Sequence, residues 1–181
     1  MAQYTSILFL DLDGVLNSSK HLKTIKADTT PNPVEFELAC DLGYLFDPPC
    51  PRSTILNSIL SIDTKAVVVL NEILAKSGAK VVISSSWRYS HPLEALERIL
   101  KFKGFQGDIV DMTATNLDRW DHTCRGHEIQ EWMDRNPVDH FVILDDDDDM
   151  DYLKDHLIKT DYARGLSSTH IEPTLKVLAL P

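Results

Sequence analysis

The sequence predicts an α/β fold in which helices flank both faces of a parallel sheet. Two observations predict this class: short apolar runs alternate with segments of helical period, and three of the apolar runs lead directly into acidic or hydroxyl side chains. At 181 residues the chain has the length of one domain with a single hydrophobic core. We therefore expect one domain over residues 1–181, with ligands bound at the carboxyl ends of the strands.

The strands are expected where apolar residues stand together over a few positions. The first run, Ile7 to Leu10, ends in Asp11, and the run Phe141 to Leu144 reads as a fully buried strand. Further short strands are expected at residues 81–83, 109–110 and 157–159. Parallel strands need crossover connections, and the segments between these runs are long enough to supply them.

Four helices are expected between and after these strands. Between residues 63 and 77 the apolar positions recur at helical spacing, Asp63 suits the N-cap, and Gly78 suits the stop. A second helix is expected at 92–102, with Ser90 as its cap and Gly104 near its end. The others are expected at about 126–135, halted before Pro137, and at 171–180.

Residues 18–60 interrupt the alternation of strands and helices. This segment holds two of the three cysteines and five of the nine prolines, namely Pro31, Pro33, Pro48, Pro49 and Pro51. It shows no clean hydrophobic period, so we interpret it as one insertion after the first strand, a minimal cap with little regular structure. No large cap domain is expected.

Composition and charge narrow the class of protein. A hydrophobic fraction of 43% with 25% charged residues is that of a globular protein and excludes gross disorder. The formal net charge is −10, which argues against broad, sequence-independent binding to nucleic acid because such binding needs a positive surface. Recognition of one phosphate end by a few local cations remains compatible with this charge.

The cysteines and the hydropathy indicate a compartment. Cys40, Cys50 and Cys124 are odd in number and match no metal-binding spacing, which is typical of free thiols in a reducing environment. The sequence shows neither a signal-peptide pattern nor an apolar run of about 20 residues that would cross a membrane. We expect a cytoplasmic protein without a membrane partner and see no sign of an obligate protein partner.

Three polar groups follow three of the apolar runs, and in a parallel sheet such positions converge on one edge. They are Asp11-Leu12-Asp13-Gly14, Ser84-Ser85-Ser86 and Asp145-Asp146. The last pair opens an acidic run that continues to Asp149. Carboxylates at the end of a buried strand repel one another unless a cation lies among them.

These residue types suit phosphoryl transfer. Asp11 at a strand end can attack phosphorus, and Asp13 can protonate the leaving oxygen and later accept a proton from water. Gly14 removes a side chain where the backbone must approach the phosphate. Oxygen-only ligands indicate Mg²⁺, while a serine hydroxyl and one Arg or Lys would hold the remaining phosphate oxygens.

The segments FLDLDGVLN, VVISSSW and VILDD resemble the first, second and fourth motifs of the haloacid dehalogenase-like (HAD) superfamily. This resemblance implies a Rossmann-like core and Mg²⁺, with Asp11 as nucleophile and metal ligand. It implies that Asp13 is the general acid/base and that its main-chain carbonyl is a further ligand. Asp145 and Asp146 match the closing acidic pair, one bound to the metal directly and the other through water.

The phosphate ligands are chosen by position along the chain. Counting from the residues that open the second strand favours Ser85 over Ser84, and Ser86 is the weakest choice. The third motif of the superfamily needs a cation before the last acidic strand, and Arg125 is our choice. Lys101 and Lys103 are the alternatives.

Several short sequence strings are similar to those of small HAD domains found alone or within RNA-repair proteins. The strings that carry this similarity are DGVLNS, ISSSWR, RGHEI, LDDDDD and KTDYARGL. The long acidic run departs from the pattern and leaves the roles of Asp147 to Asp149 open between a solvated loop and, for Asp149, a group that supports the metal ligands. We interpret Trp87 and Arg88 as a packing anchor and its ion-pair partner rather than as groups that read the substrate.

Several other functions are weighed against this one. A receiver domain places its acidic pair after the first strand and the accepting Asp later, the reverse of the order here. A dehalogenase does not need Asp13, and an EF-hand loop would need a closing Glu that is missing. A phospho-ligand or metal-binding scaffold would normally lack the nucleophile, which is present as Asp11.

The substrate is expected to be a phosphomonoester, with an RNA or DNA end favoured by the resemblance. A site without a large cap would be open to a polymer end. Lys20, His21, Lys23 and Lys26 could supply a basic lip there, but we favour a solvated linker as the interpretation of these four residues. Small nucleotide or sugar phosphates and phosphoproteins remain alternative substrates.

Overall fold

The computed structural model describes residues 4–28, 31–114 and 124–179, and of residues 26–28 it describes the backbone. Its centre is a five-stranded, entirely parallel sheet in the order β3-β2-β1-β4-β5. The strands are β1 (Tyr4–Leu10), β2 (Lys80–Ile83), β3 (Ile109–Met112), β4 (Val138–Asp145) and β5 (Leu157–Lys159). The predicted α/β class with a parallel sheet is confirmed.

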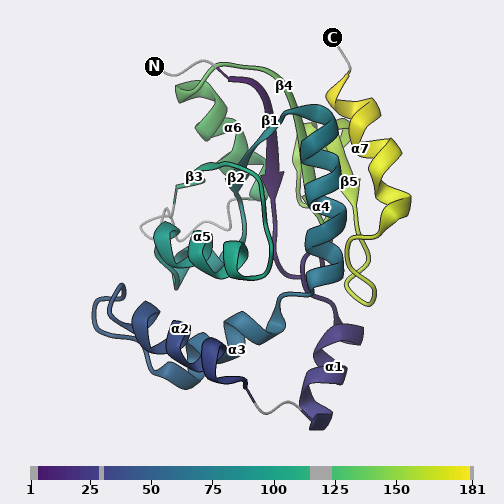
Figure 1. Cartoon of the computed structure of the whole chain (residues 1–181). Coiled ribbons are helices and arrows are strands. Elements are labelled where there is room, and N and C mark those ends of the chain that lie inside the picture. The colour runs from purple at the N-terminus through teal and green to yellow at the C-terminus, as the bar shows by residue number, and fades with distance from the viewer. Residues whose placement is uncertain (1–3, 29–30, 115–123, 180–181) are drawn as a thin grey trace.

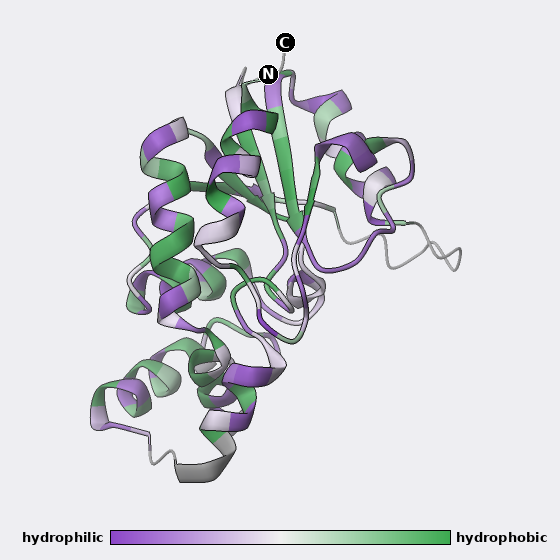
Figure 2. Ribbon diagram, turned by 90° about the vertical axis from the view of Figure 1, so that its right-hand side faces the viewer, coloured by the Kyte–Doolittle hydropathy of each residue, from purple (hydrophilic) through white to green (hydrophobic). Residues whose placement is uncertain are grey.

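Helices cover both faces of this sheet (Figure 1). One face packs against α4 (Thr64–Ser77), α5 (Leu93–Phe102) and α7 (Ile171–Leu178), and the other against α6 (Arg125–Arg135). Three short 3₁₀ segments complete the described structure: η1 (Ser86–Tyr89), η2 (Asp151–His156) and η3 (Ser168–His170). Successive side chains of β1 alternate between the two faces, as the pleat requires. Figure 2 shows the central strands in the green of hydrophobic residues.

The register of the sheet brings three strand ends to one level. Leu10 pairs with Ile83 of β2 on one side and with Leu144 of β4 on the other. The next residues continue this pairing, since Asp11 N–H donates to Leu144 O (3.0 Å) and Ser84 N–H donates to Leu10 O (2.9 Å). The chain leaves β1 toward β2 and later returns on the other side to form β4, so the strand order reverses at β1. Open α/β sheets bind ligands at such a point.

The predicted start and end of α4 are confirmed. The Asp63 side chain accepts a hydrogen bond from Lys65 N–H, and Gly78 ends the helix in the left-handed conformation with φ of 67°. The expected cap of α5 is wrong: Pro92 precedes the helix without a side-chain cap. Ser90 Oγ instead bonds to Trp87 O and to His91 Nδ1, because the intervening turn directs it back toward η1.

The expectation of little regular structure in residues 18–60 is wrong. The segment forms three helices, α1 (Ser19–Asp28), α2 (Pro33–Gly43) and α3 (Arg52–Ser61). Two of its prolines lie at helix starts instead of breaking helices: Pro33 opens α2 behind a capping box formed by Asn32 and Glu35, and Pro51 precedes α3. The proline count therefore misled, because a proline at a first helical turn lacks only an N–H that would have no partner there.

The three-helix insertion lies beyond the carboxyl ends of the strands. In Figure 1 the arrowhead of β1 points toward α2 and α3, which lie below the sheet. Helices α2 and α3 pack on each other, and their buried Leu42, Ile55 and Ile59 belong to the same hydrophobic cluster as Leu8 and Leu10 of β1. The insertion is thus joined to the core by continuous apolar packing and stands at the edge where the predicted site lies.

Among the described helices, none taken singly combines the length and the apolar composition of a membrane span. The pair α3 and α4 reaches that length only together, with a bend of 61° between them.

Candidate active site

Three carboxylates meet where β1 and β4 end, and we refer to Asp11, Asp145 and Asp146 as the carboxylate cluster. One oxygen from each of the three lies within 4.8 Å of the others. Asp11 is 4% exposed and Asp145 is 1% exposed, because both follow the buried residues of their strands directly. The convergence expected from strand order is therefore observed for these three residues.

Arg125, the first residue of α6, places its guanidinium against the carboxylate cluster. Its Nη1 lies 3.9 Å from Asp11 Oδ1, and its Nε lies 3.9 Å from Asp145 Oδ2. Each of these two carboxylate oxygens, and Nη1 itself, is buried and lacks a hydrogen-bond partner among the described residues. Such orphaned polar atoms are costly, so their common position marks a place where a polar ligand fits.

Burial and charge act against each other on these groups. Burial raises the pKa of Asp11, while Arg125 and a hydrogen bond with the Ser85 side chain lower it. Burial likewise raises the pKa of Asp145, and the neighbouring Asp11 carboxylate raises it further. Burial lowers the pKa of Arg125, but Asp11 and Asp145 outweigh that effect and raise it. The cluster therefore holds more negative charge than one guanidinium balances, which favours a further cation.

Asp13 is held by two hydrogen bonds to opposite oxygens. Asn17 Nδ2 donates to Oδ1 at 2.7 Å, and Trp87 Nε1 donates to Oδ2 at 3.0 Å. The carboxyl group therefore has a defined orientation two residues from Asp11, as a proton-transfer group requires. The sequence predicted that Trp87 is a packing anchor and missed its contact with the site. The Trp87 indole N–H donates to Asp13, the candidate acid/base.

Gly14 occupies the turn between Asp13 and the insertion with φ of 68°. A Cβ here would lie 2.3 Å from Asp146 Cγ, so the missing side chain makes room for a member of the carboxylate cluster. Its N–H donates to Asn17 Oδ1 at 3.0 Å, and its carbonyl accepts from Thr160 Oγ1 at 2.8 Å. The expectation that Gly14 admits the phosphate stays a prediction.

Ser84 and Ser85 are both fully buried after β2. The Ser85 hydroxyl lowers the pKa of Asp11, and it caps η1 by accepting from Trp87 N–H at 3.4 Å. Ser84 Oγ has no partner within the described part of the chain. The choice of Ser85 over Ser84 as the phosphate-binding hydroxyl stays a prediction.

The contacts of Arg88 indicate a structural role. It is 4% exposed, forms an ion pair with Glu128 of α6, and donates from Nη1 to the carbonyls of Ser84 (2.6 Å) and Ser85 (2.8 Å). Tyr89 Oη also donates to Glu128, at 2.9 Å. This network ties the serine loop after β2 to the helix that carries Arg125.

Three of the other candidate cations have partners away from the carboxylate cluster. Lys101 pairs with Glu97, and Lys103 pairs with Glu35 of α2. Of the basic lip, His21 bonds to Leu60 O and lies near Asp63, while the side chain of Lys26 lies outside the described residues. Arg125 is therefore the basic residue that these contacts favour for the phosphate.

The acidic run that ends β4 has a structural role that the sequence did not reveal. Asp149 Oδ2 accepts from Arg125 N–H at 3.0 Å, and Asp149 O accepts from Gly126 N–H at 3.2 Å. Asp149 thus satisfies two free N–H groups at the start of α6. Asp148 faces Lys159 at 3.3 Å. The signal that would have revealed this link, a contact between residues 24 apart, is not local in sequence.

The donor set of the carboxylate cluster fits Mg²⁺. It consists of oxygen ligands, it includes the orphaned Asp145 Oδ2, and one oxygen from each of its three carboxylates is close enough to the others to bind one ion. Asp13 lies outside this group as a carboxylate, and its predicted contribution is its main-chain carbonyl.

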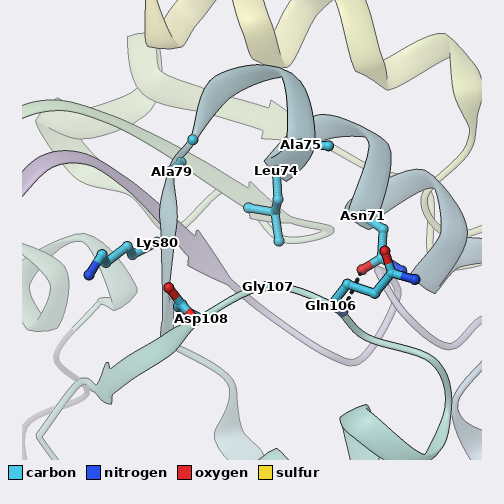
Figure 3. A pocket seen from close by; sticks show the side chains of 9 residues that line it. Asn71, Leu74, Ala75, Ala79, Lys80, Gln106, Gly107 and Asp108 are labelled. Carbon is cyan, nitrogen blue, oxygen red and sulfur yellow. Dashed lines mark hydrogen bonds between the residues drawn. The ribbon is translucent and has the colours of Figure 1, made fainter.

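Two of the cavities among the described residues lie away from the carboxylate cluster. One of about 460 Å³ lies between the α2–α3 loop and the segment after η1, with Phe46, Tyr89 and His91 in its wall. His91 stacks on Trp87 at 5.1 Å between ring centroids, which connects this cavity to Asp13. The other, of about 280 Å³, lies at the amino ends of β2 and β3, where Lys80 and Asp108 line it (Figure 3). It is therefore at the opposite edge of the sheet from the carboxylate cluster.

Comparison with known protein families gives a match over most of the chain. A family model described as the HAD domain in Swiss Army Knife RNA repair proteins matches residues 7–171. The match begins inside β1 and ends at the first residue of α7, so it includes the insertion and every residue of the carboxylate cluster. No curated protein and no solved structure matches the chain at a significant level.

Proposed function

Because the chain belongs to the family of HAD domains in Swiss Army Knife RNA repair proteins, we propose that it is a phosphomonoester hydrolase acting on a phosphorylated RNA or DNA end. The observation that carries this proposal is the buried Asp11 Oδ1, which faces Arg125 without a hydrogen-bond partner among the described residues. A nucleophile must keep such an atom free for the substrate.

The residues support a two-step displacement. An Asp11 oxygen attacks phosphorus, the bond from phosphorus to the leaving oxygen breaks, and Asp13 delivers its proton to that oxygen. In the second step water attacks the aspartyl-phosphate, Asp13 takes the proton from that water, and inorganic phosphate leaves with the Asp11 carboxylate restored. Ser85 and Arg125 hold the non-reacting phosphate oxygens throughout.

Asp11, Asp145, Asp146 and the Asp13 carbonyl would hold Mg²⁺. The ion supplies positive charge that neutralises the phosphate and the crowded carboxylates. The chain's own part is to keep these oxygens buried and close together, as the positions of Asp11 and Asp145 at adjacent strand ends ensure.

A phosphate-release screen with the full chain tests the proposal. The substrates are oligonucleotides with 3′- or 5′-phosphates, mononucleotides, sugar phosphates and phosphopeptides. We expect release from an oligonucleotide end, loss of release in EDTA and recovery with Mg²⁺. Release from a sugar phosphate or a phosphopeptide alone would identify a small-molecule or protein phosphatase. No release from any substrate would contradict the proposal and favour a phospho-ligand or metal-binding scaffold.

The metal requirement is a separate prediction. We expect Ca²⁺ to inhibit, because it accepts more ligands in looser geometry and would let both Asp11 oxygens bind, which holds the nucleophile away from phosphorus. Replacing Asp145 or Asp146 by Ala is expected to raise the Mg²⁺ concentration needed for half-maximal rate. Full activity in EDTA after exhaustive dialysis would contradict the scheme.

A further inference from the structure

A second group of metal-ligating side chains lies where the start of α6 meets the start of η2. Cys124, His127 and Asp151 each offer one ligand atom, and these atoms lie within 4.8 Å of one another. His127 Nε2 is 3.1 Å from Asp151 Oδ2. Cys124 is half-buried, whereas the other two are exposed, so the point on which they converge is open to solvent on one side.

The spacing along α6 places the thiol and the imidazole together. Cys124 is the N-cap residue and His127 the third residue of the helix, and His127 N–H donates to Cys124 O at 3.0 Å. Both side chains therefore project from the first turn, one before and one after Arg125.

The carboxylate is brought to them by a close contact between backbones. A Cβ on Gly126 would lie 2.2 Å from Met150 O, so only glycine lets the first turn of α6 approach the Met150 backbone this closely. The hydrogen bonds from Arg125 N–H and Gly126 N–H to Asp149 hold the same contact. Asp151 directly follows Met150 in the chain. The backbone contact at Gly126 therefore sets the position of Asp151 relative to Cys124 and His127, in addition to the contacts of the exposed side chains.

The three ligand types differ from those of the carboxylate cluster and select a different metal. Thiolate and imidazole suit a borderline-soft ion such as Zn²⁺, whereas Mg²⁺ prefers oxygen. Zn²⁺ binds sulfur at about 2.3 Å and nitrogen at about 2.0–2.1 Å, so ligand atoms that lie within 4.8 Å of one another need only small side-chain rotations to surround it. A three-ligand site leaves the fourth position to water.

We propose that Cys124, His127 and Asp151 form a Zn²⁺ site separate from the carboxylate cluster. Zinc held there links the first turn of α6 to η2 through side chains, in addition to the backbone contact at Gly126. Since Arg125 lies between two of the ligands in the chain, the site also restrains the residue whose guanidinium faces Asp11. The proposal does not depend on the phosphatase function.

Cobalt titration of the metal-free full chain tests the site, because Co²⁺ takes zinc ligands and shows a charge-transfer band in the near ultraviolet when a thiolate binds. We expect this band to reach its maximum at one Co²⁺ per chain and to be displaced by Zn²⁺ but not by Mg²⁺. Cys124→Ser should abolish it, while Cys50→Ser, which removes another half-buried free thiol, should leave it intact. No band, or a band that survives Cys124→Ser, would refute the proposal.

A second variant guards against misfolding of the first. His127 is exposed, and Gln keeps a donor for Asp151, so His127→Gln should fold. Its Zn²⁺ affinity, measured by competition with a chromophoric chelator in excess Mg²⁺, should fall by at least the roughly 10–100-fold that loss of an outer-shell partner costs. Asp11→Asn should bind Zn²⁺ like the wild type. Equal affinity of wild type and His127→Gln would overturn the assignment, and weakened binding in Asp11→Asn would place the zinc in the carboxylate cluster instead.

Discussion

At the scale of single residues, the surroundings give two nearby aspartates different properties. Asp11 is almost fully buried, with Oδ1 unpartnered among the described residues, whereas Asp13 is half-buried with both oxygens hydrogen-bonded. A nucleophile needs a free oxygen, and an acid/base needs a fixed orientation and a path to water. The environment of each residue therefore supports the role proposed for it.

Asp11→Asn tests the nucleophile. The amide keeps the shape of the side chain but cannot attack phosphorus, so we expect turnover to vanish while the circular dichroism spectrum stays unchanged. Asp139→Asn, at an exposed position of β4, is the control and should keep wild-type activity. Substantial activity in Asp11→Asn, with deamidation excluded by mass spectrometry, would remove Asp11 from the mechanism.

Asp13→Ala separates proton transfer from attack. We expect the rate on alkyl phosphates to fall by roughly 10²–10⁴-fold, as for loss of a general acid/base, and the rate on aryl phosphates to fall less because their leaving groups need less protonation. Trp87→Phe keeps an aromatic ring but removes the donor to Asp13, so it should shift the same ratio in the same direction to a smaller extent. An equal loss on both substrate types would show that Asp13 is structural or only a metal ligand.

At the scale of elements, the Arg88–Glu128 ion pair joins η1 to α6. Both side chains are buried, at 1% and 6% exposure, and the pair links the loop of Ser85 to the helix of Arg125. Its value therefore lies in holding two elements of the site in one relative position. A buried pair is costly to break because the remaining charge loses both water and partner.

Glu128→Gln is expected to reduce the free energy of unfolding by about 3–5 kcal/mol, the usual cost of leaving one member of a buried pair uncompensated. Urea denaturation followed by tryptophan fluorescence measures this loss. The control is Glu97→Gln, which breaks the exposed pair with Lys101 on α5 and should cost less than about 1 kcal/mol. Similar losses in the two variants would show that the Arg88–Glu128 pair does not hold η1 to α6.

At the scale of the whole molecule, the position of the three-helix insertion bears on which substrates the proposed site accepts. It lies at the carboxyl edge of the sheet, and its α2–α3 loop borders the cavity of about 460 Å³ beside η1. We therefore expect substrate contacts beyond the phosphate to come from this loop, from η1 and from the surfaces around them.

The substrate prediction compares a mononucleotide with a short RNA or DNA that carries the same terminal phosphate. A polymer end contacts more of this surface, so we expect a higher kcat/KM for the oligonucleotide. Because the chain carries a net charge of −10, this advantage should come from few contacts and weaken only modestly between two salt concentrations. A mononucleotide or sugar phosphate processed as efficiently would instead indicate that the insertion closes over small substrates.

Local patterns in the sequence predicted the strands, α4 with both of its ends, and the aspartates at the strand ends. These features depend on hydrophobic period and capping, which act between residues near one another in the chain. The same local reasoning failed for residues 18–60, because it counted prolines as breakers without considering that Pro33 and Pro51 lie at helix starts.

The tertiary structure alone decided which side chains meet. The bond from Trp87 to Asp13 joins residues 74 apart, the bond from Asp149 to Arg125 joins residues 24 apart, and Cys124 meets Asp151 only because Gly126 lets two backbones touch. Such contacts depend on how helices and loops pack across the sheet, and no local pattern encodes that packing. The sequence by itself therefore determined the chemistry available at the strand ends, while the packing decided its orientation and its neighbours.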